Sequence, residues 1–504
     1  MADLGTVDLL VIGGGVNGAG IARDAAGRGL SVVLTEKDDL AEGTSSRSGK
    51  LVHGGLRYLE YYEFRLVREA LTEREVLLSI APHIIWPMRF VLPHSPEQRP
   101  AWLVRLGLFL YDHLGGRKRL PGTRSLDLRT APEGAPIKDR FTRGFEYSDC
   151  WVDDARLVIL NALDAAERGA TILTRTRAIS ARRENGLWRA ELKRGSGETL
   201  TVSARGIINA AGPWVDQVIA NVTRANSSRK VRLVKGSHIV TAKFWEGNQA
   251  YLFQNTDGRV IFMNPYQGDK TLIGTTDIPY EGDAKDVTVD ESEIDYLLSA
   301  VNRYVKAELT RADVLHSFSG VRPLLEDDAD NPSAVTRDYV FDVDEADGKL
   351  PMLSVFGGKI TTYRELAERG LAKIAPFFPQ MTGDWTAKAP LPGGDMQNAD
   401  FESFEADFHA SHGFLPPALA RHYARLYGTR ADRLIGSATS LADLGHHFGG
   451  LLYAREIDHL VTAEWAETGE DILDRRTKHG LELSEAEKRA VGDYLAERQA
   501  LAAQ

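Results

Sequence analysis

The chain has 504 residues, more than one hydrophobic core usually supports, so we expect two or three domains. Its 43% hydrophobic and 26% charged residues are typical of a globular protein, and the formal charge of −10 argues against a general nucleic-acid binder. The single cysteine, Cys150, excludes an internal disulfide and a cysteine-rich metal site, and it favours a reducing compartment such as the cytoplasm.

Two segments bear on export and membrane insertion. The first residues lack a basic segment and run directly into glycines, so we expect no signal peptide. The most apolar later stretch, residues 101–111, is interrupted by Arg105 and is too short to span a bilayer. We therefore expect no transmembrane helix.

The first 36 residues predict a strand, a helix and a second strand. Residues 7–12 are an apolar run typical of a buried strand, residues 16–28 are rich in alanine and lack proline, and residues 31–35 are rich in β-branched side chains. Between the first strand and the helix lies GGGVNG, which fits the pattern G-x-G-x-x-G. This unit indicates a dinucleotide-binding βαβ fold.

The glycine motif has a physical purpose at each position. Gly13 permits a tight turn, Gly15 lets the backbone approach a pyrophosphate, and Gly18 allows close helix–strand packing. The helix N-terminus stabilises the anion, and Glu36, at the end of the second strand, is placed to accept hydrogen bonds from a ribose. Together these features predict a dinucleotide site that includes Gly13, Gly15, Val16, Asn17, Gly18 and Glu36.

Further along the chain, the pattern alternates between helices and strands. We expect a helix over 59–81 that ends at Pro82, an irregular region over 93–136 with one amphipathic helix, a helix over 153–169, a strand over 206–210 and β-rich structure over 238–274. Asp257-Gly258 and Gly268-Asp269 mark hairpin turns in the β-rich part. Beyond about residue 391 charged helices run to the end, which indicates a separate helical domain.

Three later segments favour FAD over NAD. Residues 44–58 are rich in hydroxyls and then glycines, which suits a chain that follows an extended cofactor and passes a flat ring. Residues 208–214 end a strand with small residues, and residues 356–363 form a second glycine turn that leads into a helix. A chain that contacts one cofactor through segments spread over more than 300 residues suits FAD better than NAD.

In these motifs the chain resembles the aerobic, FAD-dependent glycerol-3-phosphate dehydrogenases. The resemblance rests on segments that fall in order between residues 13 and 364: GGGVNGAGIARDAAGRGLSV, TSSRSGKLVHGGLRYLE, FEYSDCWVDDARL, NAAGPWV, KGSHIV, IGTTD, SGVRPL and FGGKITTYR. The glycine motif is shared by all flavin oxidoreductases of this fold, whereas LVHGGLRYLE, SGVRPL and FGGKITTYR together are distinctive. The tail beyond residue 391 has fewer motifs and supports the resemblance less firmly.

The resemblance implies a fold of mixed α/β and α+β class. We expect a Rossmann-like FAD-binding domain of the glutathione-reductase/amino-acid-oxidase type over 1–85, 151–230 and 318–390, a β-rich substrate domain over 86–150 and 231–317, and a helical domain over 391–504. The expected FAD contacts beyond the glycine motif and Glu36 are Ser45, Ser46, Lys50, Leu51, His53, Ala178, Ala211, Gly212, Gly357, Gly358 and Thr361.

The implied reaction is oxidation of sn-glycerol 3-phosphate to dihydroxyacetone phosphate, with electrons passing from FAD to a membrane quinone. The resemblance also implies a homodimer in the cytoplasm that binds peripherally to the inner face of the cytoplasmic membrane. We expect no nucleic-acid partner, and no His/Asp/Glu spacing predicts a metal site.

The chemistry of this reaction calls for a base and for cations that bind a phosphate. Arg57, Arg322 and Lys359 are candidates because each lies beside glycine or proline in a motif. By resemblance, the catalytic residues are His238, Arg322 and Lys359, and the substrate contacts are Arg57, Tyr58, Thr275 and Thr276. Histidine suits the role of base because its ordinary pKa is about 6.5.

Residues 99–120 combine apolar and aromatic residues at helical spacing with a basic flank. On the residues alone, a core helix with a solvated basic turn is the simpler interpretation, while the resemblance favours contact with anionic lipid. Two other functions remain open. A glycerol-3-phosphate oxidase would share nearly every motif, and a non-catalytic flavin or nucleotide sensor would need no set of cations. An amino-acid oxidase is disfavoured because it needs only one carboxylate-binding arginine.

Overall fold

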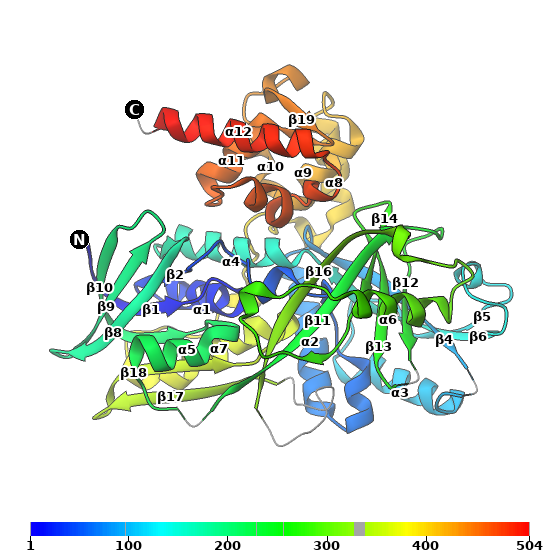
Figure 1. Ribbon diagram of the computed structural model, residues 1–504, viewed down its shortest axis with the longest axis horizontal. Coiled ribbons are helices and arrows are strands. Elements are labelled where there is room, and N and C mark those ends of the chain that lie inside the picture. The colour runs from blue at the N-terminus through cyan, green and yellow to red at the C-terminus, as the bar shows by residue number, and fades with distance from the viewer. Residues whose placement is uncertain (1, 96, 228, 256, 327–337, 503–504) are drawn as a thin grey trace.

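The computed structural model describes residues 2–95, 97–227, 229–255, 257–326 and 338–502. Figure 1 shows two β-sheets with their helices side by side in one body, and the C-terminal helices, in orange and red, standing on it. The sequence range 318–390 includes residues 327–337, which lie outside the described residues.

The first sheet has a parallel centre in the order β18-β10-β1-β2-β7. β17 pairs antiparallel with β18, and the β8–β9 hairpin joins through β10. The strands are β1 Ala2–Ile12, β2 Val32–Thr35, β7 Thr171–Leu173, β8 Thr176–Glu184, β9 Leu187–Arg194, β10 Thr199–Asn209, β17 Val340–Ala346 and β18 Lys349–Phe356.

The apolar run that predicted the first strand is buried on both faces of this sheet. Leu9 and Val11 pack with helices α1 (Val16–Gly27), α4 (Asp154–Glu167) and α7 (Tyr363–Ile374), whereas Leu10 and Ile12 pack toward β8 and β9. A strand covered on both sides needs apolar residues at every position, which explains why the run is continuous. The short helix α5 (Val215–Gln217) follows β10.

The second sheet is antiparallel except where β12 pairs parallel with β4. Its strands are β3 Leu51–Val52, β4 Ile85–His94, β5 Arg124–Asp127, β6 Arg143–Val152, β11 Val231–Ala242, β12 Ala250–Gln254, β13 Val260–Tyr266, β14 Lys270–Gly274, β15 Ile278–Pro279 and β16 Val314–Leu325. Helices α2 (Phe64–Ile80), α3 (Ala101–Leu114) and α6 (Glu291–Asn302) lie around it. β3 and part of β16 come from ranges that the sequence analysis grouped with the first domain.

Two elements differ from the sequence expectation. The helix expected over 59–81 is divided into a 3-10 turn, Leu56–Tyr61, and α2, because Tyr62 takes a left-handed φ of 59° that interrupts the helix. The C-terminal part also contains a short hairpin, β19 (His447–Gly449) and β20 (Leu452–Tyr453), among its helices.

The C-terminal helices form a unit with its own core, as the sequence predicts. They are α8 Phe401–Ser411, α9 Pro417–Tyr427, α10 Ala431–Ile435, α11 Ala454–Ala463 and α12 Glu485–Ala502. Tyr423, Ile457 and Leu460 are fully buried within this unit. The unit is joined to α4 by an ion pair between Arg156, which is 0% exposed, and Glu464, which is 1% exposed.

We predict that Glu464→Gln destabilises the protein strongly, because it leaves the buried Arg156 charge uncompensated. Loss of one partner of such a pair costs about 3–5 kcal/mol. Burial would raise the pKa of Glu464, but Arg156 holds it below its usual value. The contribution of the pair is therefore present at neutral pH and is lost as the pH falls through the folded-state pKa.

Thermal and urea unfolding at several pH values measure this effect. The control is Glu167→Gln, which breaks the more exposed pair with Arg430 across the same boundary and should cost less than about 1 kcal/mol. Equal losses of stability in the two variants would contradict the prediction.

Candidate active site

A cavity of about 950 Å³ runs from the glycine turn after β1 to the second sheet. Its walls come from the turn, the loop after β2, the segment 53–64, the end of β10, strands β11–β14, β16 and the second glycine turn. The two sheets therefore meet around one elongated cavity, which suits an extended cofactor with a substrate at one end.

The glycine turn has the geometry that a pyrophosphate requires. Gly13 has a φ of 112°, and a Cβ there would lie 2.5 Å from the carbonyl oxygen of Ala210. A Cβ at Gly18 would lie 1.9 Å from the Gly13 oxygen, so both positions exclude side chains. Helix α1 begins at Val16 without a side-chain cap from Gly15, and its N-terminus faces the cavity. A phosphate group fits this position.

Glu36 adjoins the same turn. Its carboxylate accepts hydrogen bonds from the amides of Gly14 (2.7 Å) and Asp38 (2.9 Å), and burial raises its pKa above the usual value. Ser45 accepts a hydrogen bond from the amide of Val16 at 3.0 Å. The loop after β2 is thus attached to the glycine turn through two predicted cofactor residues, Glu36 and Ser45.

The second glycine turn meets the first although they are far apart in the sequence. Asn17 donates a hydrogen bond to the carbonyl oxygen of Gly357 at 3.2 Å, and a Cβ at Gly358 would lie 3.0 Å from the Asn17 amide nitrogen. The amide of His53 donates to the Thr361 hydroxyl at 3.2 Å. These contacts bring three motifs of the sequence to one wall of the cavity.

Most of the predicted cofactor residues line the cavity, and three do not. Those that line it are Gly13, Gly15, Val16, Asn17, Glu36, Ser45, Leu51, His53, Ala178, Ala211, Gly212, Gly357, Gly358 and Thr361. Gly18 acts through packing, and the Lys50 ammonium is buried in an ion pair with Asp154 at 2.9 Å. Ser46 accepts a hydrogen bond from Lys50 through its backbone oxygen. Lys50 and Ser46 thus shape the loop from behind the cavity wall.

Two of the predicted catalytic residues, His238 and Arg322, lie at the second-sheet end of the cavity. His238 on β11 pairs across the sheet with Gly274 of β14, where a Cβ would lie 2.0 Å from the imidazole ring. Its ring stacks on Phe318 of β16, with centroids 5.0 Å apart. Arg322, also on β16, donates to the Thr275 hydroxyl at 3.1 Å and forms an ion pair with Asp277. Glycine at position 274 therefore makes room for the histidine.

Lys359 and Arg57 approach the cavity from the first domain and the 3-10 turn. The Lys359 ammonium lies 3.9 Å from the centroid of the Tyr58 ring, and Arg57 donates to the Tyr61 hydroxyl at 3.3 Å. Arg57, Tyr58, Thr275, His238, Arg322 and Lys359 all line the cavity. Thr276 does not line it, because its buried hydroxyl donates to Glu293 and accepts from the Ser237 amide.

The electrostatics of this end keep His238 neutral. Burial lowers the pKa of His238 well below its usual value, and the charges of Arg322 and Lys50 lower it further. Within the described part of the chain, its buried Nδ1 has no hydrogen-bond partner. A neutral imidazole beside cations can accept a proton while the cations hold an anion.

Two residues of the site were not predicted. Asp277 forms an ion pair with the Arg322 guanidinium. It is the last residue of the IGTTD motif, two positions after the predicted substrate contact Thr275, so the sequence could have indicated it. Asn264 on β13 lines the cavity, and its buried Oδ1 lacks a partner among the described residues. Nothing in the sequence pattern distinguishes Asn264 from an ordinary polar residue of a strand.

A buried His/Glu group lies outside the cavity, in the C-terminal unit. One ligand-type atom each from His422, Glu456 and His479 lies within 4.8 Å of the others, although the sequence spacing indicated no metal site. Glu456 accepts hydrogen bonds from His422 (2.8 Å) and Tyr427 (2.7 Å). These bonds account for one carboxylate oxygen as part of a buried polar network.

Helix α3 presents apolar side chains to solvent beside the cavity mouth. Trp102, Leu106 and Phe109 are 69%, 46% and 51% exposed, and Tyr62 in the neighbouring segment is 80% exposed. Leu103, Leu106 and Leu110 of the same helix line the cavity. No helix in the described ranges is both long and apolar enough to cross a membrane.

Comparison with known proteins agrees with this geometry. Residues 8–364 match the family described as FAD dependent oxidoreductase, and residues 385–500 match the C-terminal domain of alpha-glycerophosphate oxidase. The chain is 68% identical to D-erythritol 1-phosphate dehydrogenase of Brucella abortus, over 98% of each chain. It is 54% identical to glycerol-3-phosphate dehydrogenase of Pseudomonas aeruginosa, over 97% of this chain and 94% of the relative.

A solved structure is similar over nearly the whole length. The glycerol-3-phosphate dehydrogenase of Bacillus halodurans, complexed with FAD, matches with a TM-score of 0.75 and 28% identity over 98% of this chain and 94% of that one. The predicted fold class is confirmed by this match and by the two sheets with their helical unit. The chain therefore belongs to the FAD-dependent oxidoreductase family that includes the glycerol-3-phosphate dehydrogenases, and its cofactor is FAD.

Proposed function

We propose that this protein oxidises a secondary hydroxyl of a short polyol phosphate. The observation that carries the proposal is that the cations Arg57, Arg322 and Lys359 line the same cavity as the buried, neutral His238. Several cations suit a phosphate dianion better than a single carboxylate, and a neutral imidazole suits the removal of a hydroxyl proton.

Bound FAD supplies a two-electron acceptor for the hydride that leaves the substrate carbon. His238 takes the hydroxyl proton, and its stacking on Phe318 and its contact with Gly274 fix the direction of the ring. Asp277 and Thr275 hold the Arg322 guanidinium in place before substrate arrives. Such preorganisation lowers the entropy cost of placing the substrate.

D-erythritol 1-phosphate is our first candidate for the substrate. The family resemblance of the sequence motifs implies sn-glycerol 3-phosphate, and the glycerol-3-phosphate dehydrogenase of Pseudomonas aeruginosa supports that second candidate at 54% identity. The relative named for erythritol 1-phosphate is more similar, at 68%. Both molecules carry a phosphate and a secondary hydroxyl, so the same cations and base serve either one.

We further propose that α3 rests on an anionic membrane surface and that a membrane quinone re-oxidises the flavin. Trp102 and Phe109 are exposed aromatic residues on a helix whose other residues line the cavity, so a lipid-soluble acceptor would reach the cavity at this rim. Arg117 and Lys118 are exposed at the end of the helix, whereas Arg119 donates to the Asn398 carbonyl at 2.7 Å. The expected localisation and homodimer remain predictions.

Anaerobic mixing with candidate substrates tests the proposed reaction. We expect D-erythritol 1-phosphate to bleach the flavin absorbance band with a second-order rate constant at least about 10-fold above that of sn-glycerol 3-phosphate. Free erythritol and free glycerol should not bleach it, because they lack the phosphate. A faster reaction with sn-glycerol 3-phosphate would move the assignment to the second candidate, and no bleaching by either would refute the polyol phosphate proposal.

The acceptor is tested by re-oxidising the reduced protein. Rapid re-oxidation by a soluble quinone and slow re-oxidation by air are expected. The opposite result would favour an oxidase.

We predict that Arg322→Met lowers kcat/KM for the preferred polyol phosphate by about 100-fold, because it removes a charged hydrogen-bond donor to the phosphate. FAD content should stay unchanged. Arg259→Met is the matched control, since Arg259 has the same 26% side-chain exposure and also pairs with an aspartate, but lies outside the cavity lining. Unaltered kinetics in Arg322→Met would remove Arg322 from the substrate site.

We also predict that Trp102→Glu/Phe109→Glu weakens binding to anionic vesicles by about 100-fold, because two apolar side chains no longer enter the lipid interface. Activity with a water-soluble dye should persist. Leu315→Glu, at another exposed apolar position on β16, serves as the control in the same vesicle sedimentation assay. Equal vesicle binding by both variants would exclude α3 as the contact.

A further inference from the structure

The loop of residues 36–47 forms one wall of the FAD site. Besides Glu36 and Ser45, which bond to the glycine turn, the amide of Ala41 donates to the Gly14 oxygen at 3.2 Å. A Cβ at Gly14 would lie 2.8 Å from the Glu36 side chain, so the loop and the turn are in direct contact. The position of this loop therefore determines whether Glu36 and Ser45 lie against the glycine turn and complete this wall of the cofactor site.

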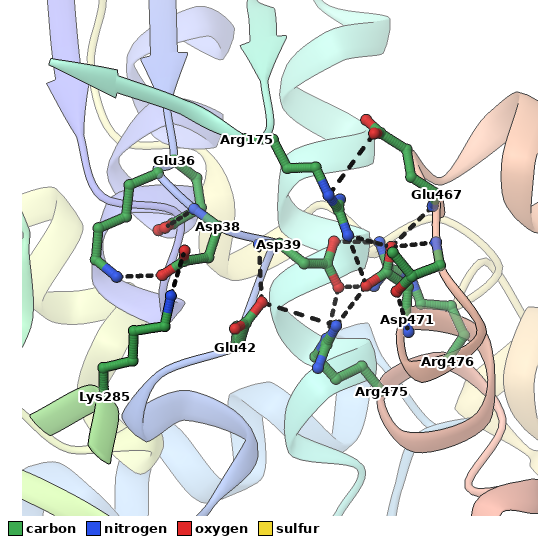
Figure 2. Close-up of polar contacts among 12 residues, drawn as sticks. Glu36, Asp38, Asp39, Glu42, Arg175, Lys285, Glu467, Asp471, Arg475 and Arg476 are labelled. Atoms are coloured by element: carbon green, nitrogen blue, oxygen red, sulfur yellow. Dashed lines mark hydrogen bonds and ion pairs between the residues drawn. The ribbon is translucent and has the colours of Figure 1, made fainter. Parts of the chain in front are cut away.

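Asp39 lies in the middle of this loop and turns away from the cavity toward the C-terminal unit. It is 1% exposed and does not line the cavity. Arg475 Nε donates to it at 2.6 Å, and Arg476 binds both of its oxygens, one of them at 2.9 Å. Both arginines come from one π-helical turn, Asp471–Arg476, as Figure 2 shows.

A second connection reaches the same loop through Arg175, in the turn before β8. Its backbone amide donates to the Asp38 oxygen at 2.8 Å, while its guanidinium binds Asp471 at 2.7 and 2.9 Å. Arg475 also binds Asp471 (Figure 2). Burial would raise the pKa of Asp471, but the Glu467 amide and the arginines around it lower it to about 2. The loop is thus held at two neighbouring residues by one turn of the C-terminal unit.

The charged groups of Asp39, Asp471, Arg475 and Arg476 are almost completely buried. Each of them therefore needs its partner at hydrogen-bond distance. Buried ion pairs add little net stability when complete, but an incomplete set leaves a desolvated charge. Such a set favours one arrangement of the loop over all others. It connects the cofactor wall to residues more than 400 positions away in the sequence.

We propose that Arg475, Arg476 and Asp471 are positioning residues for FAD, and that the C-terminal unit holds the Glu36 wall of the cofactor site closed through Asp39. None of these three residues is among those that line the cavity, so they act through the loop. The inference rests on FAD as the cofactor and is independent of which polyol phosphate is oxidised.

FAD retention on dilution of the holoenzyme, followed by flavin fluorescence, tests this role. Asp39→Asn should raise the Kd of FAD by about 10- to 100-fold, the effect of losing hydrogen bonds to a charged group. Glu464→Gln is the matched control, because Glu464 is also about 1% exposed and its side chain also binds a buried arginine across the same boundary. Among the described residues its side chain bonds to none of the loop, and its backbone oxygen, which accepts from Arg476 at 2.7 Å, is kept in the variant. Its FAD Kd should stay within about twofold of the parent, while its unfolding temperature falls.

At saturating FAD, the kcat of Asp39→Asn should match that of the parent, since the loop closes once FAD is bound. An unchanged Kd in Asp39→Asn, or an equal increase in Glu464→Gln, would overturn the proposal. Arg475→Lys provides a second test that keeps the charge but cannot bind Asp39 and Asp471 together. It should raise the Kd by about 3- to 10-fold, and an unchanged Kd there would also overturn the proposal.

Discussion

The contact between the turn after β1 and the end of β10 sets the geometry of the whole site. Gly13 approaches the Ala210 oxygen so closely that no side chain fits, and Gly18 packs on Gly13 in the same way. Because α1 starts inside this contact, its positive end is fixed at the carboxyl edge of the parallel sheet. The loop after β2 and the second glycine turn both attach to this point, so their positions follow from it.

In the reaction that we propose, the second sheet must hold an anion next to a base. Cations attract a phosphate, but they also make protonation of a nearby histidine harder. In this site burial and the Arg322 charge lower the pKa of His238, which keeps the imidazole unprotonated before reaction but also makes it a weaker base. The residues that give His238 its space, Gly274 and Phe318, lie on strands that flank β11 on either side. The register of β11 with its two neighbouring strands therefore determines the space around the His238 ring and the direction in which it points.

Local patterns predicted the parts of the site whose function depends on neighbours in the sequence. Gly13, Gly18 and Glu36 could be assigned because a glycine turn between strand and helix has few other uses. Lys50 was expected to contact FAD because it lies in the motif of residues 44–58, yet its ammonium pairs with Asp154 more than 100 residues away. Thr276 likewise turns to Glu293. The direction of the Lys50 and Thr276 side chains depends on which face of their loop is covered by other parts of the fold. Residue spacing in the sequence does not determine this.

The contacts that complete the FAD site also span the chain in a way that affects its biogenesis. Asn17 and Gly357 are 340 residues apart, and Asp39 and Arg476 are 437 residues apart. Contacts at such separations form late and slowly, and domains fold in order as they leave the ribosome. The first βαβ unit can therefore take shape early in translation, but its cofactor wall is complete only when almost the last residues have emerged. If the C-terminal unit holds the Glu36 wall as we propose, tight flavin binding is coupled to the end of synthesis, and a chain that stops early binds its flavin more weakly.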